Sequence, residues 1–120
     1  MKIAFPIQAN EGLNGSLAEH FGRAPRFVIY ETDKDEVHTI DNTGDHFGGQ
    51  ISTPVLLSKN HVDILICRGL GRRAIARFAE LGINIFLTQS QIVKQALDAY
   101  KKGELTPATD ADGCAGRHGE

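Results

Sequence analysis

Two short segments of the chain carry the same tripeptide, His-Phe-Gly, and an acid precedes each of them. They are EHFGRAP at residues 19–25 and DHFGGQI at residues 45–51. Neither segment has the periodicity of a helix or a strand, so both are predicted to be loops. Neutral imidazole is a ligand for iron, copper, zinc and nickel. His20 and His46 are therefore candidate metal or cluster ligands; the alternative is that each is a surface or capping histidine in a glycine-rich turn.

A second motif, GLGRRA at residues 69–74, follows an apolar segment and opens a predicted helix. It matches the pattern G-x-G-x-x-A, and free backbone N–H groups at the start of a helix attract anions. Gly69, Gly71 and Arg72 are therefore candidate anion-binding residues, and Arg73 adds positive charge. A dinucleotide site would also need an acid about 20 residues further on, and none stands there. We expect a general anion pocket, unless the glycines only allow the chain to turn tightly.

Four other residues carry weaker signals. Arg23 could hold an anion with its planar fork of donors, or it could be a solvated arginine. Cys67 could be a soft ligand beside the anion pocket, although a buried free cysteine more often packs as a small hydrophobe. Cys114 and His118 have a spacing that permits metal binding, but a closed zinc site needs four ligands.

No candidate nucleophile stands beside a candidate base, so the sequence does not predict an enzyme. Acidic residues concentrate at 31–36, within a predicted hairpin. A two-metal hydrolytic site would need carboxylates that converge at strand ends. The first predicted strand offers none, because it is apolar after Lys2.

Alternation and apolar runs divide the chain into strands and helices. Pro54 is acceptable only in the first turn of its helix, and Ser90 is a candidate N-cap. Gly82 and Gly103 suit helix ends. Strands are predicted at residues 2–7, 26–31, 37–41, 62–67 and 83–88, and helices at 50–60, 72–81 and 91–102.

This order of elements brings several connections to one edge of a sheet. If the second strand pairs antiparallel with the first, and helical crossovers return parallel and right-handed, the connections 8–25, 42–50, 68–71 and 88–90 meet there. Ligands bind at such edges in open α/β sheets. The connection 8–25 is also long for a compact domain, which is typical of a functional or disordered loop. Both His-Phe-Gly segments are therefore predicted to lie at the ligand-binding edge.

The bulk composition excludes several classes of protein. The chain has 120 residues, a net charge of −2 and 41% hydrophobic residues, which fits one globular domain without a broad nucleic-acid-binding face. No apolar run approaches the roughly 18 residues that a membrane span needs. Two cysteines do not make a disulfide framework, so a cytoplasmic location is expected. Residues 1–105 are predicted to form the domain, and the glycine-rich residues 106–120 a flexible tail.

The segment SLAEHFGRAPRFVIYE, residues 16–31, resembles the signature loop and second strand of the dinitrogenase iron–molybdenum cofactor biosynthesis family, which includes NifX-like, NafY-like and NifB C-terminal-domain-like proteins. The likeness continues through VDILICRGLGRRA, LGINIF and ALDAYKKGEL, over about residues 1–105. It implies a ribonuclease-H-like three-layer α/β fold with three helices. Its mixed five-stranded sheet would have the order 3-2-1-4-5, with strand two antiparallel.

The resemblance also implies a role as carrier for an iron–sulfur or iron–molybdenum type cluster. The family's loop histidine corresponds to His20, its arginine to Arg23, and its second histidine less directly to His46. Cys67 departs from the pattern, because a small residue is expected there. Nitrogenase itself is not implied, since related small proteins hold other clusters, including one of molybdenum and copper.

Three hypotheses follow. The first is a non-enzymatic cluster carrier in cofactor assembly or storage, whose partners are the proteins that donate and accept the cluster. The second is a small anion- or nucleotide-binding regulatory module that uses the turn from Gly69 to Ala74. The third is a protein-interaction domain that meets a partner through the same edge.

Overall fold

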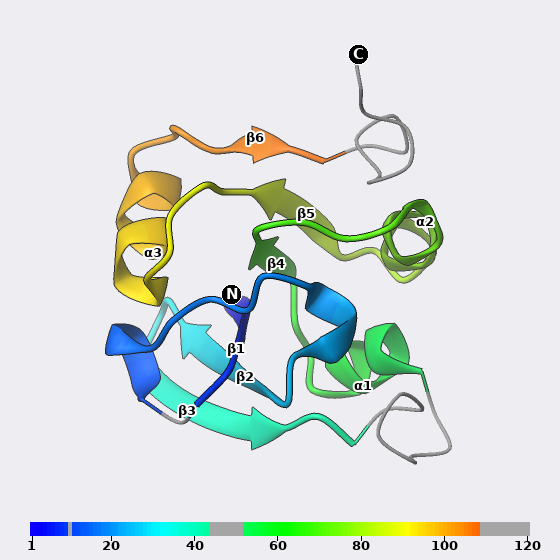
Figure 1. Cartoon of the computed structure of the whole chain (residues 1–120), viewed down its shortest axis with the longest axis horizontal. Coiled ribbons are helices and arrows are strands. Elements are labelled where there is room, and N and C mark those ends of the chain that lie inside the picture. Colours follow the sequence, from blue (N-terminus) through cyan, green and yellow to red (C-terminus); the bar gives the residue numbers. More distant parts are fainter. Residues whose placement is uncertain (10, 44–51, 109–120) are drawn as a thin grey trace.

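Six strands form one mixed sheet in a computed structural model that describes residues 1–9, 11–43 and 52–108 (Figure 1). Across the sheet, these strands follow the order β3-β2-β1-β4-β5-β6, where the bounds are β1 (Lys2–Ile7), β2 (Arg26–Glu31), β3 (Glu36–Asp41), β4 (Ile64–Cys67), β5 (Asn84–Leu87) and β6 (Thr106–Pro107). The helices are α1 (Thr53–Lys59), α2 (Arg72–Glu80) and α3 (Val93–Lys101), and two 3-10 turns are η1 (Gly12–Asn14) and η2 (Phe21–Arg23).

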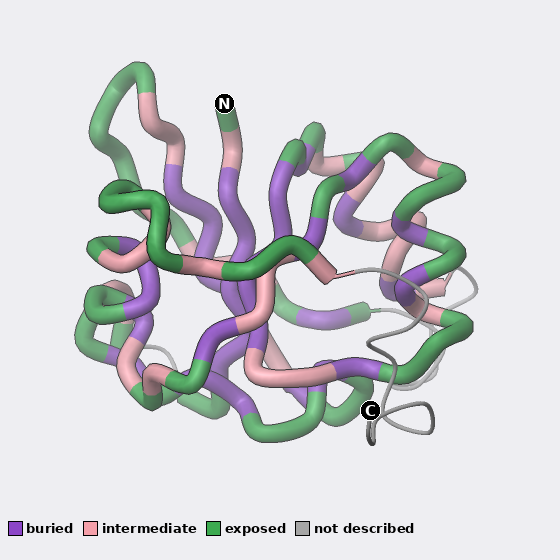
Figure 2. Tube along the Cα trace, turned by 90° about the horizontal axis from the view of Figure 1, so that it is seen from above, coloured by how far each residue is buried: buried purple, intermediate pink, exposed green. Residues whose placement is uncertain are grey.

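The sheet is the middle of three layers. In Figure 1, α3 covers one face of the sheet, and α1 and α2 cover the other. Strand β1 alternates between two apolar clusters: Ile3 and Phe5 pack on the α3 side, and Ala4 packs on the side of α1 and α2. Both faces of the central strands are thus buried, as expected for a sheet with helices on both sides. Figure 2 shows this burial along the central strands, with exposed residues on the connections and on the outer sides of the helices.

Strand directions place the predicted connections at one edge. Strand β1 pairs antiparallel with β2, which in turn pairs antiparallel with β3, and β1 pairs parallel with β4. Strands β4 and β5 are also parallel. Strands β1, β3, β4 and β5 therefore all end at the same edge, which we call the carboxyl edge. The predicted three-layer fold, its strand order 3-2-1-4-5 and its antiparallel second strand are confirmed.

The structure adds a sixth strand to the predicted five. Leu87 of β5 pairs antiparallel with Thr106, and Phe86 pairs with Pro107. Residues 106 and 107 thus belong to the sheet, where the sequence predicts the start of a tail. Residues 109–120 of that predicted tail lie outside the described residues.

Helix boundaries follow the predicted signals with one correction. Pro54 lies in the first turn of α1, and Gly82 and Gly103 follow α2 and α3 with positive φ angles of 76° and 74°. The predicted N-cap at Ser90 is wrong, because α3 begins only at Val93. The Val93 N–H instead donates to the backbone carbonyl of Gly15 at 3.0 Å. A backbone carbonyl of the connection between β1 and β2 therefore accepts a hydrogen bond from the first turn of α3.

The helices are short, with seven residues in α1 and nine in each of α2 and α3. Within the described ranges, none of them combines the length and the apolar character that crossing a membrane requires.

Candidate functional site

The connection between β1 and β2 crosses the carboxyl edge from one face of the sheet to the other. Leu17 packs in the apolar cluster under α3, whereas Ala18 and Phe21 pack in the cluster under α1 and α2. The Ala18 N–H donates to the Pro6 carbonyl at 2.8 Å, which holds the crossing against the end of β1. The connection is long because it contributes buried residues to the apolar clusters on both faces of the sheet.

Phe21 anchors the first His-Phe-Gly segment in the core. Its side chain is only 5% exposed, and its ring centroid lies 5.8 Å from that of Phe27 and 5.4 Å from that of Phe78. His20 and Arg23, on either side of this anchor, are exposed. The tripeptide thus buries its aromatic ring and presents the neighbouring imidazole and guanidinium groups at the carboxyl edge.

His46 lies outside the described residues, as do Cys114 and His118. The described residues that flank the second segment can be placed. Strand β3 ends at Asp41 on the carboxyl edge, and α1 begins at Thr53 beside the first segment. The prediction that His46 faces His20 stays a prediction.

A cavity of about 530 Å³ opens at the carboxyl edge between η2, the start of α1 and the first turns of α2. Its volume falls in the range of roughly 300–1,000 Å³ that is typical of small-molecule and cofactor sites. The lining residues are Phe21, Gly22, Ser52, Thr53, Pro54, Leu70, Gly71, Arg73, Ala74 and Arg77. The floor is thus largely apolar, and the charged groups come from one helix.

The charge in the cavity is positive. Arg73 and Arg77 stand one helical turn apart on α2, which places them on the same face. Arg77 forms an ion pair with Glu80 at 3.0 Å, and Arg73 forms none among the described residues. Gly71 precedes the helix and has no side chain to cap the first N–H groups. Two guanidinium groups and the positive end of the helix dipole therefore favour an anionic ligand.

The predicted anion-binding turn contributes part of its residues to this cavity. Gly71 lines it, whereas Gly69 and Arg72 do not. Arg73, which was expected to add positive charge, lines the cavity, and Arg77 was missed. The four-residue spacing between Arg73 and Arg77 was the available signal, because such residues share one face of a helix.

Cys67 does not reach the cavity. Its side chain is completely buried in the apolar cluster between the sheet and the α1–α2 layer. Burial favours a packing role, and its predicted role as a ligand stays a prediction. In the described part of the chain, no three His, Cys, Asp or Glu side chains come together as a metal-binding group.

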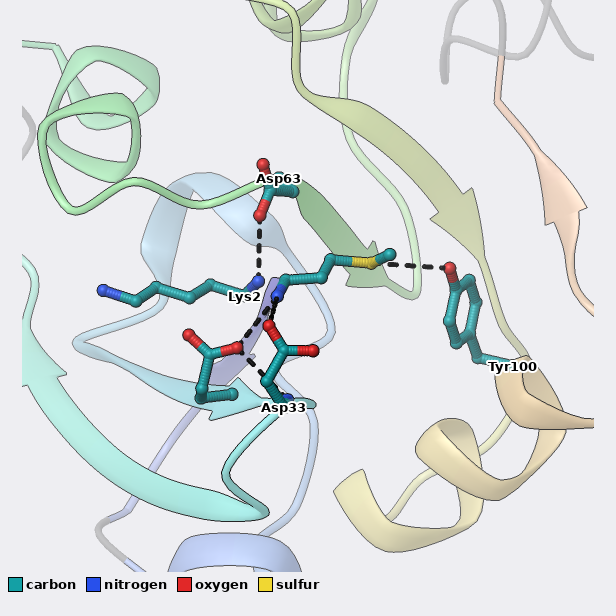
Figure 3. A network of polar contacts seen from close by, with 6 residues as sticks. Lys2, Asp33, Asp63 and Tyr100 are labelled. Carbon is teal, nitrogen blue, oxygen red and sulfur yellow. Dashed lines mark hydrogen bonds and ion pairs between the residues drawn. The ribbon is translucent and has the colours of Figure 1, made fainter.

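The acidic residues of the hairpin lie at the opposite edge of the sheet, around the start of β1 (Figure 3). The amino group of Met1 contacts Glu31 at 2.8 Å and Asp33 at 3.3 Å, and Asp63 accepts a hydrogen bond from the Lys2 N–H at 2.9 Å. The hydrogen bond from the Met1 amino group lowers the pKa of Glu31, and the same bond raises the pKa of that amino group. These acids act as charge partners, and they are far from the cationic cavity.

Comparison with known proteins identifies a family that the chain matches. The model of the family described as "Dinitrogenase iron-molybdenum cofactor" matches residues 1–103. The chain is 31% identical over 111 residues to protein MJ0580 of Methanocaldococcus jannaschii, and the match covers 88% of this chain and 89% of the relative.

Solved structures share the fold over nearly the whole chain. PH0822 has a TM-score of 0.73 and 27% identity, over 92% of this chain and 98% of that one. The apo form of the orange protein from Desulfovibrio gigas has a TM-score of 0.78 and 23% identity, over 90% of this chain and 92% of that one. These structures thus share the fold, and the match to the family model confirms the resemblance noted from the sequence.

Proposed function

Because the chain belongs to the dinitrogenase iron-molybdenum cofactor family, we propose that it is a non-enzymatic protein that binds a metal cluster. The cargo would be an iron–sulfur or iron–molybdenum type cluster, or its precursor, held during cofactor assembly or storage. The observation that carries this proposal is the cavity at the carboxyl edge, which combines ligand-sized volume with Arg73 and Arg77.

The chemistry of the cavity suits such a cargo. Sulfide-rich clusters are anionic, so guanidinium groups and backbone N–H groups at the start of α2 would neutralise their charge. His20, and with it His46, would supply metal ligands from the rim, and Arg23 would add positive charge. Few protein ligands favour release, whereas four cysteines would hold a cluster firmly.

A carrier also needs partners. We propose that one protein donates the cluster and another accepts it. The exposed positions of His20 and Arg23 keep ligands accessible at the edge, where a partner could approach the cargo.

Cluster uptake tests the histidines. The protein is incubated without air with a coloured iron–sulfur or molybdenum-containing cluster donor, and its visible absorption is recorded after desalting. We expect uptake by the wild type and loss of uptake in the double variant His20→Ala, His46→Ala. His38→Ala is the matched control, because His38 is exposed on β3. Equal uptake by the wild type and the double variant would contradict the assignment of the ligands.

A second pair of variants tests the cavity. Arg73→Ala removes a charge from the lining, whereas Arg72→Ala removes the same charge from the same turn of α2 but outside the lining. A hydrogen bond to a charged group contributes roughly 1.5–3 kcal/mol, so Arg73→Ala should weaken binding by about 10- to 100-fold. Arg72→Ala should change it only slightly. The reverse order would place the anion at the turn instead of in the cavity.

A small-molecule anion site is a second candidate function, because Leu70, Gly71 and Ala74 of the predicted turn line the same cavity. Calorimetry against a panel of nucleotides and inorganic phosphate separates the two functions. Nucleotide binding that is lost in Arg73→Ala but kept in His20→Ala would favour a regulatory anion-binding module. If none of these ligands gives a heat of binding, this second candidate function is excluded.

A further inference from the structure

Asn42 is a buried polar residue at the junction between the two histidine-bearing connections. It follows β3 directly and is only 5% exposed. A buried amide needs hydrogen-bond partners, because leaving one of its groups unpaired is costly. The partners of Asn42 therefore show which segments it holds together.

Three hydrogen bonds connect Asn42 to both neighbouring segments. Its side-chain Nδ2 donates to the Ala24 carbonyl at 2.8 Å, and its backbone N–H donates to the Pro25 carbonyl at 2.9 Å. Its Oδ1 accepts a hydrogen bond from the Thr53 hydroxyl at 3.4 Å. Ala24 and Pro25 end the first histidine segment, and Thr53 opens α1.

These bonds join two segments that line the cavity described above. Phe21 and Gly22, which lie just before Ala24, form its wall at η2, and Thr53 forms part of its wall at α1. The second histidine-bearing connection begins directly after Asn42 and ends just before Thr53. Both of its ends are thus tied to the end of the first histidine segment by one side chain.

We propose that Asn42, together with Thr53, is a positioning residue for the cargo site. The inference rests on the proposed function: the pair sets the spacing between the wall at η2 and the wall at α1, and so pre-organises the cavity for its anionic cargo. An amide suits this role because it donates and accepts at the same time. A carboxylate could accept from Thr53 but could not donate to the Ala24 carbonyl.

The expected effect follows from pre-organisation. Without the Asn42–Thr53 bond the two walls sample several spacings, and only one of these spacings binds the cargo. The apparent dissociation constant is then the intrinsic one divided by the fraction of molecules that have this spacing. If that fraction falls to about one tenth, the dissociation constant rises about tenfold. A bond that only stabilised the fold would lower the unfolding midpoint and leave the affinity of the folded protein unchanged.

The test uses tetrathiomolybdate, a coloured and sulfide-rich dianion, as the probe. Titrations of the full chain are followed by visible absorption and by visible circular dichroism. An achiral anion acquires circular dichroism only when an asymmetric site holds it in a fixed orientation. Thr53→Val removes the hydroxyl, and Thr53→Ser keeps it. Thr88→Val is the matched control, because Thr88 is also 6% exposed and follows β5 at the same edge, but does not line the cavity.

We expect Thr53→Val to weaken binding about tenfold and to reduce the circular dichroism per bound anion. Thr53→Ser should restore both quantities, and Asn42→Ala should reproduce the effect of Thr53→Val. Equal affinity and equal circular dichroism in Thr53→Val and Thr88→Val would overturn the inference, even if Asn42→Ala failed to fold. Absence of binding to the wild type would instead overturn the proposed function together with the inference.

Discussion

The anchoring role of Phe21 leads to a quantitative prediction. Replacement of a buried phenylalanine by alanine typically costs about 3–5 kcal/mol. Phe21 is 5% exposed and contacts the rings of Phe27 and Phe78, which favours a cost within this range. Because Phe21 also lines the cavity, the space left by its ring would join a region that water can enter. We therefore expect Phe21→Ala to lower the free energy of unfolding by roughly 3 kcal/mol, at the lower end of the range.

Urea denaturation followed by far-UV circular dichroism measures this cost, and an unchanged m value shows that the substitution changes the stability and not the surface exposed on unfolding. The thermal midpoint should fall by roughly 12 °C, because 1 kcal/mol corresponds to about 4 °C in a domain of this size. Phe78→Ala should cost more, about 4–5 kcal/mol, since Phe78 is completely buried. The double variant should reveal a coupling of about 0.5–1.5 kcal/mol between the two rings.

Phe86→Ala serves as the control on the other face of the sheet. Phe86 is only partly buried, and its ring lies 5.2 Å from that of Tyr100. Phe86→Ala should lower the free energy of unfolding by roughly 1–2 kcal/mol, because the substitution removes less buried apolar area. A cost below about 1 kcal/mol for Phe21→Ala would refute the reasoning, because the first histidine segment would then be held by its backbone and not by its aromatic ring.

Three further predictions concern the fold around the site. Gly82→Ala should lower the free energy of unfolding by roughly 1–2 kcal/mol in urea denaturation, because φ is 76° there. Gly69→Ala should cost far less, because Gly69 has the same open space for a side chain but lies outside the positive-φ region. Ser52→Ala should lower the free energy of unfolding by roughly 0.5 kcal/mol, because the Ser52 hydroxyl caps α1 by accepting a long hydrogen bond of 3.4 Å from the Val55 N–H. An unchanged thermal midpoint in this variant would contradict the prediction. The lowered pKa of Glu31 means that its ion pair stabilises the fold above the unfolded-state pKa of that carboxyl, and the stabilisation is lost as pH falls through the folded-state pKa. The wild type and Glu31→Gln should therefore differ in stability at neutral pH and converge in acid; a constant difference would argue against the ion pair.

Much of the fold could be predicted from local patterns. The apolar runs of β4 and β5 indicate strands covered on both faces, and the short polar turn at 32–36 makes an antiparallel hairpin. The right-handed rule for crossovers then leaves one arrangement of strand ends. For these reasons the carboxyl edge could be predicted without coordinates, once strand two is taken to pair antiparallel with strand one. The strand order 3-2-1-4-5 followed from the family resemblance. The position of Gly82 at a helix end also followed from its chemistry.

The side chains of the site depended on contacts that no local pattern contains. Arg72 and Arg73 are equivalent in the sequence, and only the rotation of α2 against its neighbours directs Arg73 and not Arg72 to the cavity. Asn42 shows no signal before the ends of two connections are brought beside it. The predicted Ser90 cap was wrong because a carbonyl from a distant loop, that of Gly15, accepts the first N–H bond of α3.

The sequence alone determined which segments meet at one edge of the sheet, because the strands follow from local periodicity and the direction of each crossover strand follows from the handedness of the chain. The tertiary structure alone decided which side chains line the cavity there. The orientation of each side chain results from packing among segments that are far apart in the sequence, and this packing also shows that Phe21 anchors the segment in which His20 and Arg23 are exposed.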